Sequence, residues 1–127
     1  MSRSSLFLAA AVAGGLALAV PAQAHPRLIA STPANGATAS NVGSVRLQFS
    51  ERLVPAFTRA ELIMTGMPGM RNHRPMKVPA RSMVLKDGRT MVVTSHSRLQ
   101  AGSYRLNWHA VSTDTHHIDG QVAFAVR

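Results

Sequence analysis

Short segments in which apolar and polar residues alternate are the feature that most restricts how this chain can fold. Three of them, residues 44–50, 102–110 and 120–127, read SVRLQFS, GSYRLNWHA and GQVAFAVR. A period of two places successive side chains on opposite faces of a strand, so each segment has one apolar face to bury. We therefore expect half-buried antiparallel strands, with the single tryptophan, Trp108, in the core between them.

The segments between these strands carry the signals of further strands and turns. Residues 59–65 (RAELIMT) predict another strand, and residues 83–94 (MVLKDGRTMVVT) predict a hairpin that turns at Asp87-Gly88. The longest helix-compatible stretch, residues 51–60, is interrupted by Pro55. The pattern predicts an all-β sandwich or barrel.

The beginning of the chain has the composition of an export signal. Arg3 precedes a largely apolar run, and residues 22–24, Ala-Gln-Ala, form the small-x-small pattern at which signal peptidases cut. The apolar run is shorter than the ~20 residues of a membrane-spanning helix. We expect residues 1–24 to be a signal peptide that is cleaved after Ala24, leaving one mature domain, residues 25–127. A retained membrane anchor is the alternative.

The lack of cysteine restricts the chemistry that an exported chain can use. The mature domain has no disulfide to stabilise it and no thiolate for catalysis or metal binding. A soft metal ion must therefore be held by methionine and histidine.

The charge is strongly basic but dispersed. Fourteen basic residues face five acidic ones, for a net charge of +9, and no block of five or six cations occurs. We expect no nucleic-acid partner, because no basic patch is interleaved with aromatic residues. Solvated strand faces are the favoured explanation of the charge, and an anionic membrane surface or an acidic protein partner is the alternative.

Residues 64–76, MTGMPGMRNHRPM, gather four of the seven methionines and one histidine. Pro68, Gly69 and Pro75 interrupt both the helical and the strand period, so we expect a loop. Thioether sulfur together with imidazole favours Cu(I) over zinc, calcium or magnesium. The candidate Cu(I) ligands are Met64, Met67, Met70, His73 and Met76. Methionines that fill gaps in the core, or an exposed loop that contacts other proteins, are the alternatives.

A second candidate metal site begins at the predicted mature amino terminus. The α-amine and ring Nδ1 of a terminal His25 can close one chelate ring on a metal ion, and Pro26 has no N–H for the metal to displace. Asp114 and His116 are two residues apart and project from the same face of an extended segment. One amine, two imidazoles and one carboxylate suit Cu(II), although Zn²⁺ can use the same set. A turn-capping aspartate, a surface histidine and a fortuitous terminal histidine are the alternatives.

The remaining histidines have weaker claims to a metal. His117 points away from His116 and is a candidate to support the metal site without binding the ion itself, or to carry protons near it. His109 lies on the polar face opposite Trp108, and His96 lies in a predicted loop. We expect both His96 and His109 to face solvent.

Taken together, these residues resemble a known family. The segments HPRLIASTPANGA, LQFSERLVPAF, MTGMPGM…H…PM and AGSYRLNWHAVSTDTHHIDGQVAFAV follow the order of the CopC/PcoC family of periplasmic copper-resistance proteins over residues 25–127. The resemblance implies a small Greek-key β-barrel or sandwich of the immunoglobulin-like type, which binds copper and passes it on without turnover. It also implies two separated sites. The Cu(II) ligands are then His25, Asp114 and His116, and the Cu(I) ligands come from the methionines and His73.

The chain departs from the family pattern in two places. Two residues separate Met70 from His73 where the family has one, and His117 stands where many relatives have proline. The local charge also opposes a bound cation. Three basic residues flank the methionine segment, namely Arg71, Arg74 and Lys77.

The favoured hypothesis is a periplasmic copper carrier or buffer with a role in copper resistance or homeostasis. We expect a monomer, not an enzyme, that exchanges copper with other periplasmic or inner-membrane copper-handling proteins. One alternative is an oxidative enzyme, because a terminal histidine paired with a second imidazole resembles the histidine brace of lytic polysaccharide monooxygenases. Against it, Asp114 occupies a position that oxygen needs, and aromatic residues are few. The other alternative is a metal-free sandwich that contacts proteins through its methionines.

Overall fold

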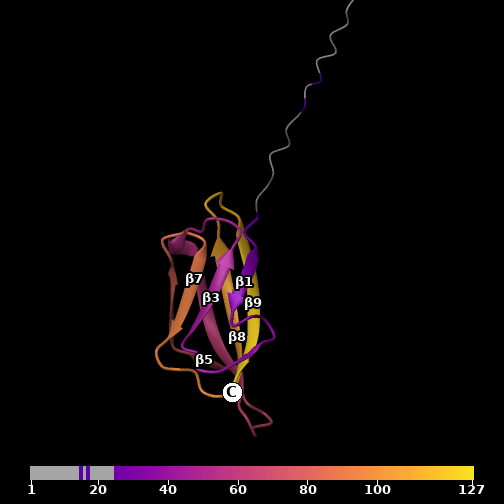
Figure 1. The fold of residues 1–127 in the computed structure, drawn as a ribbon, viewed down its shortest axis with the longest axis vertical. Coiled ribbons are helices and arrows are strands. Elements are labelled where there is room, and N and C mark those ends of the chain that lie inside the picture. The colour runs from indigo at the N-terminus through magenta and orange to yellow at the C-terminus, as the bar shows by residue number, and fades with distance from the viewer. Residues whose placement is uncertain (1–14, 16, 18–24) are drawn as a thin grey trace, which may run out of the picture.

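The computed structural model describes residues 15, 17 and 25–127, and the strands within residues 25–127 form a sandwich of two β-sheets (Figure 1). The predicted leader, residues 1–24, therefore lies outside the described residues apart from Gly15 and Ala17. No helix within the described part is long and apolar enough to cross a membrane. The elements seen there are, in order, β1 (Leu28–Thr32), β2 (Thr38–Ala39), β3 (Ser44–Phe49), the 3-10 turn η1 (Pro55–Phe57), β4 (Arg59–Gly66), β5 (Met76–Val78), β6 (Ala80–Val84), β7 (Thr90–Ser95), β8 (Gly102–Val111) and β9 (His117–Val126).

The strands form a four-stranded sheet in the order β1-β3-β7-β6 and a five-stranded sheet in the order β2-β9-β8-β4-β5. Neighbouring strands are antiparallel, except that β2 runs parallel to β9. The chain passes from one sheet to the other on entering and on leaving β2, and again between β3 and β4, between β5 and β6, and between β7 and β8. Such crossings give a Greek-key arrangement, and the all-β, two-sheet fold class is confirmed.

The alternating segments became the central strands. The predicted strands at residues 44–50, 59–65, 102–110 and 120–127 correspond to β3, β4, β8 and β9, although β9 already begins at His117. The predicted hairpin is β6–β7, and Gly88 in its turn has a φ of +72°, a backbone conformation that glycine adopts without strain. The stretch at residues 51–60 contains only the single turn η1 before β4 begins.

The apolar faces of the two sheets meet in one core. Phe49 of β3 and Leu106 of β8 are fully buried, and Trp108 is 7% exposed, as the sequence predicted. The indole of Trp108 packs edge to face against Phe49, with ring centroids 5.0 Å apart. On the neighbouring strand Gly120 lies opposite Trp108, so that the ring has the space that a side chain at 120 would fill.

The methionine loop is shorter than predicted. Met64 belongs to β4 and Met76 to β5, and the two residues are direct partners in the antiparallel pair. The expectation of a loop is therefore wrong at Met76, whereas Met64 lies in the strand that was predicted for residues 59–65. The breakers Pro68, Gly69 and Pro75 act locally, and the flanking methionines are free to pair as strand residues.

The two candidate metal sites lie at opposite ends of the sandwich. β4 and β8 are antiparallel, with Arg59 opposite His109 and Gly66 opposite Ser103. The loop after β4 therefore lies at the end where β8 begins, and the β8–β9 connection lies at the other end, as Figure 1 shows. A strand of this length spans roughly 30 Å, which is the scale of the separation.

Candidate metal sites

Backbone contacts hold His25 at one end of the sandwich. Pro26, the next residue, is fully buried, and the N–H of Arg27 donates to Ser50 Oγ at 2.9 Å. The N–H of Ser50 in turn donates to the Arg27 carbonyl at 2.9 Å. His25 itself stays exposed, next to the end of β3. Its position is therefore fixed by the two residues that follow it.

A tight turn between β8 and β9 brings the other predicted ligands to the same place. The N–H of Thr115 donates to the Ser112 carbonyl at 2.9 Å, and Thr115 has a φ of +73°. This left-handed conformation is rare for a β-branched residue and marks local backbone strain. Asp114 and His116 thus meet because the chain folds back at Thr115. Our expectation of an extended segment at this point is wrong, although the two side chains do lie together.

The imidazole of His25 contacts that of His116, with ring centroids 4.4 Å apart and ring planes at 68°. Nδ1 of His116 lies 2.9 Å from Oδ2 of Asp114, and the hydroxyl of Ser112 donates to the other oxygen of this carboxylate. The structure therefore brings together all three side chains that the sequence assigned to this site. Nδ1–H of His116 donates to the carboxylate, which leaves Nε2 of the neutral ring as the available electron-pair donor.

The hydrogen bonds to Asp114 also fix its charge. Donation by Ser112 and then by His116 lowers the pKa of the Asp114 carboxyl below its ordinary value. The group is therefore ionised at neutral pH and keeps a negative charge next to His116. Within the part of the chain that the structure describes, no three His, Cys, Asp or Glu side chains already surround a point where an ion could bind. A metal ion at this place therefore requires small side-chain rotations and a further donor.

At the opposite end the sequence Met-Pro-Gly-Met forms a β-turn. The N–H of Met70 donates to the Met67 carbonyl at 3.2 Å, and Gly69 has a φ of +76°. Proline second and a left-handed glycine third are the signature of a type II turn. The turn returns Met70 to within a few ångströms of Met67, so that two sulfur-bearing side chains start from neighbouring points.

The predicted ligands of the methionine loop differ in burial. Met64 is 7% exposed within the core and Met67 packs against its edge, whereas Met70 and Met76 are 57% and 55% exposed. Both ring nitrogens of His73 are buried and lack a hydrogen-bond partner. Such orphaned buried polar atoms cost free energy and call for an explanation, of which a bound ion is one.

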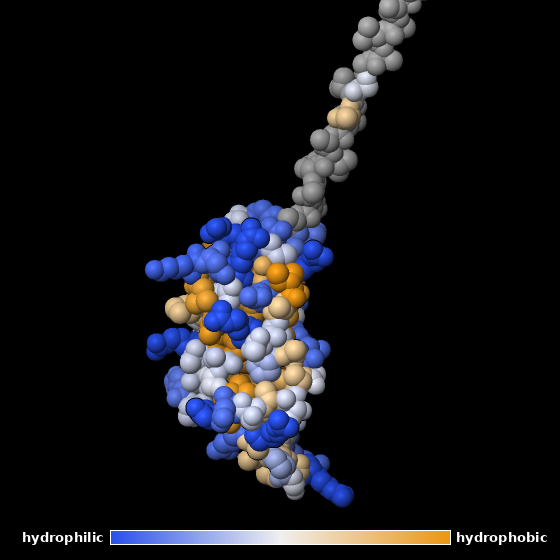
Figure 2. Space-filling view, viewed as in Figure 1, coloured by the Kyte–Doolittle hydropathy of each residue, from blue (hydrophilic) through white to orange (hydrophobic). Residues whose placement is uncertain are grey.

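The cations around the loop do not all oppose a bound ion. Lys77 Nζ lies 2.7 Å from Glu61 Oε1, so a carboxylate offsets its charge. Arg71 and Arg74 are exposed, and water screens charges in that position strongly. Figure 2 shows weakly hydrophobic atoms next to strongly hydrophilic ones at this end of the molecule.

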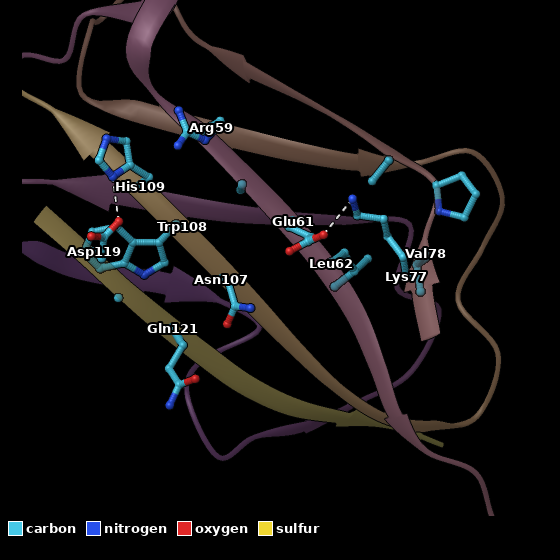
Figure 3. A pocket seen from close by; sticks show the side chains of 14 residues that line it. Arg59, Glu61, Leu62, Lys77, Val78, Asn107, Trp108, His109, Asp119 and Gln121 are labelled. Carbon is cyan, nitrogen blue, oxygen red and sulfur yellow. Dashed lines mark hydrogen bonds and ion pairs between the residues drawn. The ribbon is translucent and has the colours of Figure 1, made fainter. Parts of the chain in front are cut away.

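The outer face of the five-stranded sheet carries a groove of about 1040 Å³, lined by both polar and apolar residues and seen in Figure 3. In it Nδ1 of His109 lies 2.6 Å from Oδ1 of Asp119, and only 21% of the His109 side chain is exposed. The prediction that His109 simply faces solvent is therefore wrong, whereas His96 is exposed as expected. The sequence reasoning missed this pair, whose partners meet only through the β8–β9 register.

The fold and the site geometry define a class, a small two-sheet β-sandwich with a candidate metal site at each end. The family described as CopC domain matches residues 28–127, and the chain belongs to this CopC family. It is 48% identical over 115 residues to Copper resistance protein C of Pseudomonas syringae pv. tomato, covering 91% of this chain and 90% of that protein. It is 41% identical over 125 residues to Copper resistance protein C of Escherichia coli, covering 97% and 99%.

The comparison with a solved structure supports the same family assignment. The crystal structure of PcoC, a methionine-rich copper resistance protein from Escherichia coli, matches with a TM-score of 0.75 and 40% identity. The match covers 82% of this chain and all of that one. The family resemblance noted from the sequence is thereby confirmed.

Proposed function

We propose that this protein is a periplasmic copper carrier or buffer that serves copper resistance or homeostasis. Its relatives at 41% and 48% identity are named as copper resistance proteins over nearly their whole length. The observation that carries the proposal is the contact between His25 and His116, next to the Asp114 carboxylate. Cleavage after Ala24 and residence in the periplasm are parts of the same proposal, because they release the α-amine of His25.

The amino-terminal cluster, which consists of His25, Asp114 and His116, is the proposed Cu(II) site. Its donors are the amine and ring of His25, Nε2 of His116, and Asp114 either directly or through its hydrogen bond to His116. Nitrogen and oxygen donors of this kind suit Cu(II), which heads the affinity order of the divalent ions. The ionised Asp114 adds a negative charge that attracts the cation. The buried Pro26 keeps the backbone of His25 next to the site.

The methionine loop is the proposed Cu(I) site. We assign its donors to Met67, Met70, Met76 and His73, with Met64 anchoring the base of the loop in the core. Neutral thioethers and one imidazole are soft enough to prefer Cu(I), and an ion bound to His73 relieves its unpartnered nitrogen. The Pro68–Gly69 turn keeps Met67 and Met70 close without restricting their side chains.

We propose binding without turnover, in preference to oxidative catalysis on a polysaccharide. Among the described aromatic residues only Phe57 is strongly exposed, at 62%, whereas Tyr104 and Trp108 are buried. A flat polysaccharide needs stacking partners that this surface does not offer.

The first test uses mature protein whose terminus is verified as His25 by mass spectrometry. Cu(II), and then Cu(I) under reducing anaerobic conditions, is titrated into wild type, His25→Ala and the double variant Met67→Leu/Met70→Leu. We expect His25→Ala to lose Cu(II) binding alone and the double variant to lose Cu(I) binding alone. Met83→Leu is the matched control, because Met83 is 59% exposed but lies on β6, away from the loop.

Three results contradict the proposal. Wild type that binds neither ion tightly leaves a metal-free contact domain as the better account. Equal losses in Met83→Leu and the loop variant show that the loop has no special role. Copper-dependent cleavage of chitin or cellulose with added reductant establishes the enzyme instead.

We further propose that the protein acts as a monomer and passes copper to other periplasmic or inner-membrane copper-handling proteins. Both proposed sites lie at exposed ends of the sandwich, where a partner's ligands can approach without unfolding it. Analytical ultracentrifugation of the apo and copper-loaded forms tests the monomer. A dimer that forms only with copper contradicts it.

A further inference from the structure

We propose that His109 and His117 form a third metal site, on the outer face of the β8–β9 pair, which takes a tetrahedral divalent ion such as Zn²⁺. Their ring centroids lie 5.5 Å apart, with ring planes at 53°. The proposal is separate from the copper sites, since neither residue is among their proposed ligands, and it gives His117 a role other than the support of the Cu(II) site that the sequence suggested. It assigns a function to the polar face that the sequence analysis treated as solvated surface.

Strand register creates this pair. His109 is the direct partner of Asp119, and Val111 is the direct partner of His117, so the two histidines are diagonal neighbours. Diagonal neighbours on one face are within reach of each other's long side chains. His117 follows His116 but points the opposite way, which separates this pair from the amino-terminal cluster.

A carboxylate prepares one of the two rings for binding. Nδ1 of His109 lies 2.6 Å from Oδ1 of Asp119, an arrangement visible in Figure 3. A carboxylate behind an imidazole fixes the tautomer and the orientation of the ring, so that Nε2 carries the free electron pair. Asp119 therefore acts as an orienting group. Only the two histidine side chains supply donors, and solvent completes the coordination of the ion. The site is thus not a cluster of three or more His, Cys, Asp or Glu ligands, and no such cluster occurs in the described residues.

The ring separation is compatible with tetrahedral coordination of one ion. With metal–nitrogen bonds of about 2.0–2.1 Å, two imidazoles on one ion have centroids about 5.2 Å apart at a tetrahedral angle and about 4.5 Å apart at a right angle. The observed 5.5 Å is close to the tetrahedral value, whereas the His25–His116 separation of 4.4 Å is close to the right-angle value. Tetrahedral coordination is typical of zinc, and tetragonal coordination is typical of Cu(II).

The charges near the pair act in opposite directions. Asp119 attracts a cation, whereas Arg59 lies on β4 directly opposite His109 and repels one. Both side chains are exposed, so water reduces each effect. Removing the Arg59 charge should therefore strengthen metal binding without touching a ligand.

The test is a Zn²⁺ titration of the mature protein, followed through the side-chain imidazole signals in ¹H–¹⁵N NMR spectra. In wild type the His109 and His117 rings should respond together, with one common dissociation constant. We expect His109→Gln and His117→Gln each to weaken the response of the remaining ring by about 10-fold or more, since neither imidazole alone can chelate. Arg59→Gln should tighten binding, and His96→Gln, which replaces an isolated exposed histidine, should leave it unchanged.

Two outcomes overturn the proposal, namely rings that respond at different zinc concentrations and a His117→Gln protein that titrates like wild type. His117 is exposed at the start of β9, so this variant keeps the His109–Asp119 pair and stays informative even if His109→Gln fails to fold. Copper uptake at the two ends is unaffected by either result. A failure here is therefore distinct from a failure of the copper proposal.

Discussion

The imidazoles of His25 and His116 lie edge to face, with centroids 4.4 Å apart, although 90 residues separate them in the chain. The buried Pro26 fixes one ring, and the strained turn at Thr115 fixes the other. The contact is therefore a product of the tertiary fold. It gives the proposed Cu(II) site two imidazoles before any metal binds, so that less ordering has to occur on binding.

The proposed amine ligand exists only if His25 is the first residue. Adding Gly-Ser in front of His25 keeps both imidazoles but turns the amine into an amide, which removes the chelate ring. We expect the affinity for Cu(II) to fall about 100-fold, the scale at which an intramolecular second ligand strengthens binding. Competition with a coloured chelator measures the loss. Unchanged affinity in the extended protein contradicts a role for the amine, and an unchanged melting temperature of the apo form verifies that the fold is intact.

The carboxylate of Asp114 supports His116 through Nδ1 and adds charge to the site. We predict that Asp114→Asn lowers the Cu(II) affinity about 10- to 100-fold, the usual effect of losing a partner behind a metal-binding histidine. Cu(I) binding should not change. Asp119→Asn is the matched control, because Asp119 holds His109 in the same way on the outer face. Equal losses in both variants indicate a general charge effect in place of a local one.

The central strands could be predicted from sequence because each has an apolar face of period two. β1, β2 and β5 were not predicted. They are short, lie at the edges of the sheets and exist through their pairing with β3, β9 and β4. Sequence patterns say little about such pairing, since tertiary contacts decide it.

The residues of the candidate sites also differ in whether the sequence could predict them. Donor types and spacing identified the side chains of the amino-terminal cluster, and the structure brings all three together. Spacing did not identify the His109–Asp119 pair, because a shift of one residue in the β8–β9 register would separate it. The buried nitrogens of His73 also depend on how the loop packs, which no local pattern encodes.

Gly120 is required for the position of Trp108. A Cβ at 120 would lie 2.2 Å from Cζ2 of the indole, a ring that Phe49 also contacts. We predict that Gly120→Ala lowers the free energy of unfolding by about 1–3 kcal/mol, the usual cost of overpacking a core. Denaturant titration followed by the fluorescence of the single tryptophan measures it. Gly43→Ala is the control, because nothing lies within 4 Å of a Cβ there. Equal stability of the two variants contradicts the argument.

Asp87 makes the β6–β7 hairpin sensitive to acid. Its carboxylate accepts the Thr90 hydroxyl at 2.6 Å and the N–H groups of Arg89 and Thr90 at 2.9 Å each. The Thr90 hydroxyl and then the Arg89 N–H hold the pKa of the Asp87 carboxyl below its ordinary value of 3.8. A carboxyl whose pKa is lower in the folded state than in the unfolded chain stabilises the fold above the unfolded value, and this contribution disappears as the pH falls through the folded value.

We therefore predict that wild type is more stable than Asp87→Asn near neutral pH, and that the difference shrinks as the pH falls below about 4. Unfolding free energies of both proteins, measured between about pH 2 and pH 7, test this directly. Thr90→Val serves as a second variant, because it removes the largest of the causes that lower the pKa and nearly preserves the volume of a buried residue. Its acid sensitivity should lie between those of the other two proteins. A wild-type advantage over Asp87→Asn that stays constant across the whole pH range shows that Asp87 acts by its shape in the turn and not by its charge.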